Sequence, residues 1–366
     1  MDVKRANRNR IYRLIARSGA LSKPEIAHRL GMSLPTVMQN ITSLQEQGLV
    51  CEDGTLDSTG GRKAVAYSRD PLARVAVGVE ITRDRLEAAV VGLDGDIVES
   101  VRSRPAFAAT EAYAAALAAA IERLLEKSGT PRERVLGVGY SIPGILTAGG
   151  TVLNSDVLDL WEFDTGSLIR ETPYPAAFCN DANAAALAEL WLADPGDNFV
   201  YLALSDSVGG AIAWKGELFE GDHSRSGEFG HITLERGGAI CYCGRKGCLD
   251  CYCSARILSR HAKGDLGRFF ESLGKGDAGV AAAWNTYLDY LATGVNILNT
   301  SLDCDVVIGG YVGAHIEPHI AQLREKVAEM STFDAVAGFV KPCRRRTDAH
   351  SIGAALIHIK RFIEQV

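Results

Sequence analysis

The sequence lacks any run of about 18 uncharged apolar residues, the length that a membrane-spanning helix requires. The Ala-rich stretch at residues 112–120 is too short for this purpose and continues into Glu122 and Arg123. The first ten residues, MDVKRANRNR, carry basic side chains with no apolar core behind them, which is not typical of a secretory signal. We therefore expect a cytoplasmic protein that binds no membrane.

Low hydrophobicity, the mark of a disordered chain, is also absent, because 47% of the residues are hydrophobic and 23% are charged. A length of 366 residues is too great for one ordinary domain. The net charge of −6 is unevenly spread: residues 1–70 hold 11 Lys and Arg against 7 Asp and Glu, which leaves −10 for the rest. A basic head on an acidic body suggests that only the head meets a polyanion.

Residues 1–70 have the pattern of three helices followed by a hairpin. Apolar residues share one face of a predicted helix at residues 5–17. A second helix begins at Ser22-Lys23-Pro24-Glu25, which has the form of a capping box, and ends at Gly31. A third helix follows Ser33 to about residue 47, and strands at residues 49–50 and 64–67 enclose a Gly-containing loop. This order is that of a winged helix-turn-helix.

The third helix and the wing supply the predicted DNA contacts, because a helix end fits the major groove and reaches base edges there. The residues expected at base edges are Pro35, Thr36, Gln39 and Asn40. Arg62 would enter a minor groove, while Arg5, Arg8 and Lys63 would meet phosphates. The alternative is a small helical bundle with a solvated basic face.

From residue 74 onward strands and helices are mixed. The predicted strands cover residues 75–81, 86–93, 97–101, 135–141, 199–204 and 305–308. The predicted helices follow Thr110 to about residue 129, open at Asn180-Asp181, and cover residues 284–302 and 350–363. This pattern favours an α/β body of two lobes, in which ligands bind outside the carboxyl ends of the strands.

Five of the nine cysteines lie between Cys241 and Cys253, which is not the distribution of scattered disulfides. His231, Cys241, Cys243 and Cys248 have the spacing H-x9-C-x-C-x4-C. Three thiolates and one imidazole complete a closed tetrahedral site, so a structural zinc is predicted. Redox-active or incidental cysteines are the alternative, and Cys251 and Cys253 remain without a role.

Two further groups of polar residues have the chemistry that sugar hydroxyls require, namely fixed carboxylates, amides and imidazoles. Asn180-Asp181 stands where a strand is predicted to give way to a helix, and Glu228 precedes His231 by three residues. Each also has a simpler interpretation, because Asp181 is suited to cap a helix and Glu228 to lie on the surface.

At these residues the chain resembles the ROK family of repressors, open reading frames and sugar kinases. The resemblance rests on Asn180-Asp181-Ala182-Asn183, Glu228-x-Gly230-His231 and Cys241-x-Cys243-Gly244-x-x-Gly247-Cys248, and on a winged head with Gly60-Gly61-Arg62 that marks the repressor branch. It implies an actin-like, two-lobed sugar kinase fold with zinc at His231 and the three cysteines. It also implies sugar contacts from Asn180, Asp181, Glu228 and His231, with Asp181 as the base in an active kinase. Asp250 stands where the family usually has Glu, and it is expected as a further sugar contact.

The chain departs from the family's kinases in both predicted phosphate loops. Glu80-Ile81-Thr82-Arg83 replaces Asp-Gly-Gly-Thr, and Ser205-Asp206-Ser207 replaces Gly-Thr-Gly ahead of the retained Gly209-Gly210. A carboxylate ~5 Å from a phosphate charge costs about 3 kcal/mol at an effective dielectric of ~20. The nucleotide half of the site therefore looks degraded, while the sugar half looks intact.

The predicted protein is a sugar-responsive repressor without enzyme activity, acting as a homodimer or homotetramer on a pseudo-palindromic DNA operator. We expect the DNA-binding domain at residues 1–70 and the sugar-binding body at 71–366. One lobe would hold about 71–180 plus the helix at 350–366, and the other about 181–349, with a monosaccharide or derivative between them. The sugar would act as inducer or as co-repressor. The alternatives are a kinase that phosphorylates a hexose with ATP, and a repressor controlled by a protein partner or by zinc.

Overall fold

The computed structural model describes residues 3–56, 64–147, 149–194 and 196–366. The chain divides into two compact units. The first contains residues 1–141, 165–178 and 354–366, and the second contains 142–164 and 179–353. Among the described residues, every helix is too short or too polar to cross a bilayer. The lobe boundaries expected from the sequence stay a prediction.

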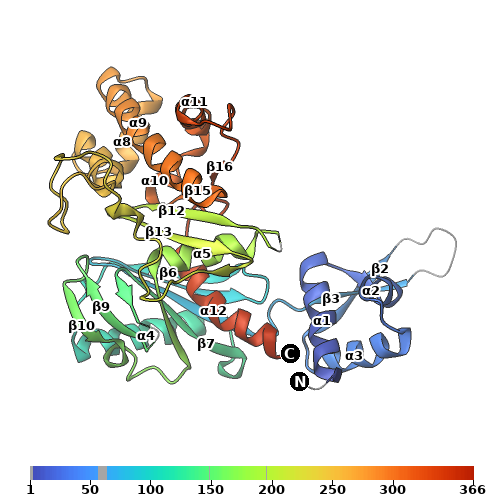
Figure 1. Ribbon diagram of the computed structural model, residues 1–366. Coiled ribbons are helices and arrows are strands. Elements are labelled where there is room, and N and C mark those ends of the chain that lie inside the picture. Colours follow the sequence, from blue (N-terminus) through green and yellow to red (C-terminus); the bar gives the residue numbers. More distant parts are fainter. Residues whose placement is uncertain (1–2, 57–63, 148, 195) are drawn as a thin grey trace. The chain divides into compact units, whose positions relative to one another are not determined.

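The N-terminal part of the first unit is a winged helix-turn-helix, as predicted (Figure 1). Its elements are α1 Val3–Ser18, β1 Leu21–Ser22, α2 Lys23–Leu30, α3 Leu34–Glu46, β2 Val50–Leu56 and β3 Ala64–Arg69. Ser22 and Glu25 form the predicted capping box, and Gly31 ends α2 in the left-handed conformation that glycine adopts without strain. The apolar faces of the three helices meet in a small buried core.

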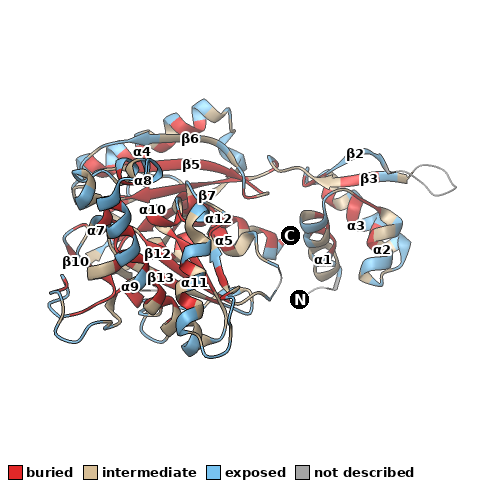
Figure 2. Ribbon diagram, turned by 90° about the horizontal axis from the view of Figure 1, so that it is seen from above, coloured by how far each residue is buried: buried red, intermediate tan, exposed pale blue. Residues whose placement is uncertain are grey.

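The rest of the first unit is built on a mixed five-stranded sheet with the order β11-β7-β4-β5-β6. Its elements are β4 Val75–Ile81, β5 Leu86–Gly92, β6 Ile97–Ser103, α4 Glu111–Ser128, β7 Val135–Ile142 and β11 Ala176–Asn180. β4 is parallel to β7 and antiparallel to β5, and both β4 and β5 are buried along their whole length (Figure 2). Strands buried on both faces read as continuous apolar runs, which is why the sequence located them closely.

The second unit contains another five-stranded sheet, with the order β14-β13-β12-β15-β16. Its strands are β12 Phe199–Leu204, β13 Val208–Trp214, β14 Glu217–Leu218, β15 Asp305–Gly309 and β16 Val340–Pro342. Helices α8 to α11 gather on one side of this sheet and α5 lies on the other (Figure 1). The main helices are α5 Asp181–Trp191, α8 Leu266–Gly274, α9 Ala278–Leu302, α10 Gly310–Gly313, α11 Ile320–Met330 and α12 Ala349–Gln365. α12 begins in this unit and continues into the first.

Several small elements complete the chain and were not predicted. They are the sheet β8 Ile145–Leu146, β9 Thr151–Ser155 and β10 Leu160–Asp164, the helices α6 Asp250–Cys253 and α7 Ala255–Ser259, and the 3-10 turns η1 Arg132–Arg134, η2 Thr165–Leu168, η3 Phe229–His231, η4 Arg260–Ala262 and η5 Glu317–His319. The predicted turn at residues 205–210 is shorter than expected, because β13 begins at Val208. The long helix expected from Trp284 begins earlier, where Asp277 caps α9.

Candidate functional site

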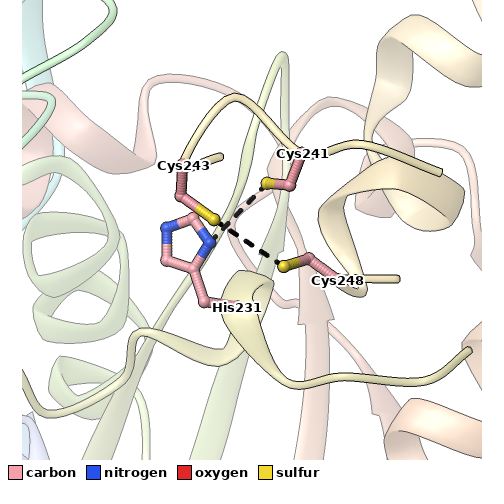
Figure 3. A group of neighbouring side chains, drawn as sticks. All are labelled: His231, Cys241, Cys243 and Cys248. Carbon is pink, nitrogen blue, oxygen red and sulfur yellow. Dashed lines mark hydrogen bonds between the residues drawn. The ribbon is translucent and has the colours of Figure 1, made fainter. Parts of the chain in front are cut away.

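One imidazole and three thiols converge in the second unit (Figure 3). The ligand atoms of His231, Cys241, Cys243 and Cys248 lie within 4.8 Å of one another. The Cys241 Sγ and His231 Nδ1 are 3.8 Å apart, and so are the sulfurs of Cys243 and Cys248. Ligands about 2.3 Å from a tetrahedral ion lie about 3.8 Å from one another, so these separations fit a metal ion held at the centre. The four predicted ligand residues therefore come together and could hold such an ion.

The backbone of residues 232–248 closes this group of ligands. Thr233 pairs with Cys248 and Ile240 with Lys246 in isolated bridges, and the Leu234 N–H donates to the Gly247 carbonyl at 2.8 Å. Gly247 has a φ of +81°, and a Cβ there would lie 1.7 Å from the Glu235 carbonyl oxygen. Any other residue at that position would force the two strands of the loop apart. Cys241 and Cys248 are buried, while Cys243 is exposed.

The second ring nitrogen of His231 points away from the thiols. Its Nε2 lies 3.8 Å from Glu228 Oε2 and 3.3 Å from the Tyr242 hydroxyl, whose ring meets the imidazole edge to face at 5.2 Å. Metal-binding histidines usually pair their other nitrogen in this way, which sets the tautomer and the ring orientation. Sequence reasoning missed Tyr242. The position of Tyr242 between Cys241 and Cys243 could have identified it, because a residue between two ligands of the cluster must lie at the edge of the cluster.

Glu228 interacts electrostatically with His231 of this cluster and with Asp181 at the start of α5. Its side chain keeps 42% of its surface exposed, yet partial burial raises the pKa of the carboxyl group, and the nearby charge of Asp181 raises it further. His231 and Arg225 act in the opposite direction. Asp181 and Glu228 are therefore electrostatic neighbours, as two residues that serve one polar ligand site would be.

Asn180, rather than Asp181, provides the helix cap of α5. The Asn180 Oδ1 accepts a bond from the Asn183 N–H at 3.2 Å, and its Nδ2 donates to the Gly144 carbonyl at 2.8 Å. Asp181 is the first residue of the helix, where the favourable end of the helix dipole stabilises a carboxylate. The simpler interpretation of Asp181 as the N-cap is thus wrong.

The carboxylate of Asp250 is buried and accepts a hydrogen bond from a backbone N–H. Only 4% of this residue is exposed, and its Oδ1 accepts a bond from the Val208 N–H at 2.7 Å. Arg256 lies 3.8 Å from Oδ2. Burial raises the pKa of the carboxyl group, and the bond from Val208 and the charge of Arg256 partly offset this. The carboxylate therefore holds the start of β13 next to the loop at residues 205–207.

The glycines retained near that loop have packing partners. A Cβ on Gly210 would lie 2.3 Å from the Phe229 ring, and one on Gly230 would lie 2.1 Å from the Val208 carbonyl oxygen. These two glycines let the segment that carries Glu228 and His231 lie directly against β13. Their presence is explained by this contact without any phosphate.

The replaced loop at residues 80–83 is a tight hairpin in the first unit. Glu80 is buried on β4 and pairs in register with Glu87 on β5. The Arg85 guanidinium lies 3.9 Å from Glu80 and 3.1 Å from Glu87, and the Thr82 N–H donates to the Arg85 carbonyl at 2.9 Å. Ile81 and Thr82 thus stand where the family's kinases have two glycines, next to two buried carboxylates on the strands that flank the turn.

The exposed side of α3 is the candidate DNA-binding surface. Ser33 caps the helix, Pro35 and Gln39 are exposed, and Thr36 is half-buried with its hydroxyl 2.8 Å from the Ser33 hydroxyl. Leu34 and Met38 are also exposed on α3, although the sequence analysis had not selected them.

The other five predicted DNA-binding residues are Asn40, Arg5, Arg8, Arg62 and Lys63. The expectation that Asn40 is exposed is wrong: it is 2% exposed, and its Nδ2 donates to the Thr36 carbonyl at 2.8 Å, because its position faces the helical core. The exposed side chain of Arg5 donates to the Gln365 carbonyl at 3.1 Å, at the end of α12, and Arg8 is half-buried. Arg62 and Lys63 lie outside the described residues.

Comparison with protein families agrees with this arrangement. The model of the ROK family matches residues 76–361, and a model of winged helix-turn-helix DNA-binding domains matches residues 4–50. The chain belongs to the ROK family. The proteins to which the chain is similar include both regulators and sugar kinases.

The relatives of this ROK chain differ in whether they match the head. A xylose repressor of Bacillus subtilis strain 168 is 24% identical over the whole chain and 97% of its own length. An N-acetylmannosamine kinase of Yersinia pestis is 29% identical over 76% of the chain and 97% of its own length. The repressor thus matches head and body, while the kinase matches a portion the size of the body alone.

Solved structures show the same division among ROK proteins. A ROK family transcriptional regulator, described as a homologue of the Escherichia coli MLC protein, has a TM-score of 0.77 and 21% identity, and the match covers 99% of this chain and 97% of that one. A ROK glucokinase of Streptomyces griseus in complex with glucose and AMPPNP has a TM-score of 0.68 and 23% identity, covering 77% and 98%. At these identities the likeness establishes the fold.

Asp250→Ala should lower the free energy of unfolding by about 1–3 kcal/mol, because it leaves the Val208 N–H buried without its acceptor. Asp250→Asn keeps an acceptor oxygen at the same place and should cost less. Chemical denaturation of both variants at neutral pH measures the difference. Equal losses for the two substitutions would show that the charge, and not the bond to Val208, is what matters.

Proposed function

We propose that this ROK protein is a sugar-responsive transcriptional repressor that lacks sugar kinase activity. The observation that carries the proposal is the presence of a complete winged helix-turn-helix on a body that keeps the clustered residues Asp181, Glu228 and His231. The xylose repressor relative is similar over the full length of this chain, head and body included.

The head binds a DNA operator as part of a cytoplasmic homodimer or homotetramer, so the operator is a pseudo-palindrome. Gln39, Pro35 and Thr36 lie on the side of α3 that reaches base edges. The exposed Leu34 and Met38 add apolar surface suited to thymine methyl groups. Arg62 and Lys63 in the wing, and Arg8 on α1, supply charge for the minor groove and the phosphates.

The body binds a monosaccharide or sugar derivative through Asn180, Asp181, Glu228 and His231. Two carboxylates, a side-chain amide and an imidazole offer the planar acceptors and donors that adjacent hydroxyls need. Because Asp250 already binds the Val208 N–H, it acts by positioning the neighbouring loop. The sugar acts as inducer if it binds the DNA-incompetent state more tightly, and as co-repressor if it prefers the other state.

His231, Cys241, Cys243 and Cys248 hold a structural zinc ion. Three sulfurs and one nitrogen at tetrahedral separations are the donor set that zinc prefers, and they leave no open position for catalysis. The bound ion fixes the loop at residues 232–248 and, through Nδ1, the orientation of the His231 ring toward Glu228.

The absence of kinase activity is inferred from the two replaced loops. Ile81 and Thr82, at the end of β4, stand where the family's kinases have two glycines. The loop at residues 205–207 is closed on itself by a bond from the Ser205 N–H to the Ser207 carbonyl at 3.2 Å. Asp206 adds a negative charge where a nucleotide phosphate would have to approach.

The kinase alternative is favoured by the retained Asp181 and by the kinase relatives, so it is tested directly. Incubation of the purified protein with Mg-ATP and a panel of aldohexoses and N-acetylhexosamines should yield no sugar-dependent ADP above the background hydrolysis. Sustained turnover with any member of the panel would establish a kinase and overturn this part of the proposal.

Asp181→Asn should abolish sugar binding, because it removes a charged acceptor from the pocket, and should leave DNA binding intact. A thermal-shift screen of carbohydrates on the full chain first identifies the effector for wild type. The variant should then lose the shift, while Glu271→Gln, which removes an exposed carboxylate of α8, should keep it. Loss of DNA binding in Asp181→Asn would instead assign a structural role to this residue.

Arg62→Ala should weaken DNA binding and reduce the salt dependence of the affinity, with a slope of log K against log[salt] lower by about 1. The probe is the duplex that the wild-type protein selects from a pool of random sequences. Arg268→Ala, which removes an exposed arginine of α8, should bind this duplex like wild type. An unchanged affinity and salt slope for Arg62→Ala would exclude the wing from the interface.

A further inference from the structure

The His231 nitrogen that faces away from the thiols already has a partner within the protein. The Tyr242 hydroxyl lies 3.3 Å from Nε2, and its ring meets the imidazole edge to face with 5.2 Å between the ring centroids. The other nitrogen, Nδ1, lies 3.8 Å from the Cys241 sulfur (Figure 3). Both ring nitrogens therefore have partners before any sugar reaches the site.

Nε2 can offer only one good hydrogen bond. When Nδ1 gives its lone pair to the metal ion of the proposed function, the ring proton is on Nε2, which is then a donor. The Glu228 Oε2 is 3.8 Å from this nitrogen, too far for a hydrogen bond, so the Tyr242 oxygen accepts the proton. A sugar hydroxyl that binds to His231 therefore has to replace the tyrosine oxygen.

The Tyr242 side chain can leave this position while the loop stays folded. The residue is 47% exposed, and the His231 side chain is itself 28% exposed. The turn around Tyr242 is closed by bonds from the Cys241 N–H to the Arg245 carbonyl at 2.7 Å and from the Gly244 N–H to the Cys241 carbonyl at 2.9 Å. A rotation of the tyrosine side chain leaves both of these bonds in place and makes Nε2 accessible to a ligand.

We propose that the Tyr242 hydroxyl occupies the position of a sugar hydroxyl on His231, and that an effector sugar binds by displacing it. The proposal rests on the sugar site of the proposed function and adds Tyr242 to that site as a specificity-determining residue. A phenol and a sugar hydroxyl both have one O–H donor and an acceptor oxygen, so the tyrosine satisfies the imidazole N–H until a sugar takes its place.

The length of the bond agrees with such an exchange. At 3.3 Å the distance between Nε2 and the Tyr242 oxygen is longer than the usual distance of about 2.9 Å between donor and acceptor, so the bond is a weak one. A better placed sugar oxygen gains more from the same N–H than the tyrosine loses.

Displacement affects how strongly the site distinguishes a sugar from its deoxy analogue. The complete sugar gains a bond from His231 but breaks the bond to Tyr242, so the two effects partly cancel. An analogue that lacks this one hydroxyl leaves the tyrosine bond intact and loses nothing there. Tyr242 therefore lowers both the affinity for the complete sugar and the discrimination at that hydroxyl.

The test compares sugar binding by the zinc-loaded full chain and by Tyr242→Phe, which keeps the aromatic ring and removes only the hydroxyl. A thermal-shift screen of both proteins with D-glucose, D-mannose, D-galactose, D-xylose and N-acetyl-D-glucosamine selects the sugar, and calorimetric titration gives its Kd. Tyr242→Phe should bind this sugar about three- to tenfold more tightly, the effect of one neutral hydrogen bond. Tyr174→Phe, which removes a hydroxyl bonded to Glu122 in the first unit, should bind it like wild type.

Monodeoxy analogues of the selected sugar test the specificity. The analogue that lacks the hydroxyl on His231 should bind wild type and Tyr242→Phe equally well, while the other analogues should bind the variant more tightly. An equal gain for every analogue would contradict the assignment of a sugar hydroxyl to Nε2.

An unchanged or weaker affinity of Tyr242→Phe, beside measurable binding by wild type, would overturn the displacement of Tyr242 and leave the sugar site standing. If neither protein binds any of the five sugars, the sugar site of the proposed function is overturned and this inference with it. Binding by Tyr242→Phe alone would support the displacement.

The zinc content of both proteins is measured first, and a crystal structure of wild type with the selected sugar decides the question if the variant does not fold or load. A sugar hydroxyl should then lie on Nε2 with the Tyr242 side chain turned away. A complex in which Tyr242 still binds Nε2 would contradict the proposal.

Discussion

The approach of one imidazole and three thiols to a common centre is the constraint on which the candidate site depends. Backbone hydrogen bonds and two isolated bridges hold the loop at residues 232–248, and the ligand cluster adds a second connection between its beginning and its end. Because His231 belongs to that cluster through Nδ1, its Nε2 is directed toward Glu228 and Tyr242. The orientation of the His231 ring is therefore set by thiols that are not among the predicted sugar-binding residues.

A second layer of contacts joins this loop to the sheet of the second unit. Gly210 and Gly230 permit the segment containing Phe229 to lie against β13, and Asp250 binds the first N–H of that strand. These contacts explain why a chain can keep several residues of the family's kinases for reasons of packing. Retained motif residues are consequently weak arguments for phosphoryl transfer, whereas the replacement of two glycines by Ile81 and Thr82 is an argument against it.

Elements governed by local chemistry were predicted well. The capping box at Ser22, the cap at Thr110 and the apolar runs of β4 and β12 are set by residues within a few positions of one another. Small elements such as β8 to β10 have no such signal, because pairing between distant segments creates them. The error at Asn40 has a different cause: Asn40 shares the i, i+3, i+4, i+7 face with the buried Val37, Ile41 and Leu44, and its polar side chain was given more weight than this spacing.

The sequence by itself determined the family, the winged head and the four residues that come together and could hold a metal ion, because capping, spacing and donor chemistry are written in short motifs. Only the tertiary structure decided which polar side chains are available to a ligand. Asp250 and Asn40 are buried and each binds a backbone group, while Tyr242 reaches His231. The physical reason is that hydrogen-bond partners and burial depend on which segments fold against each other, and residue type alone does not specify this.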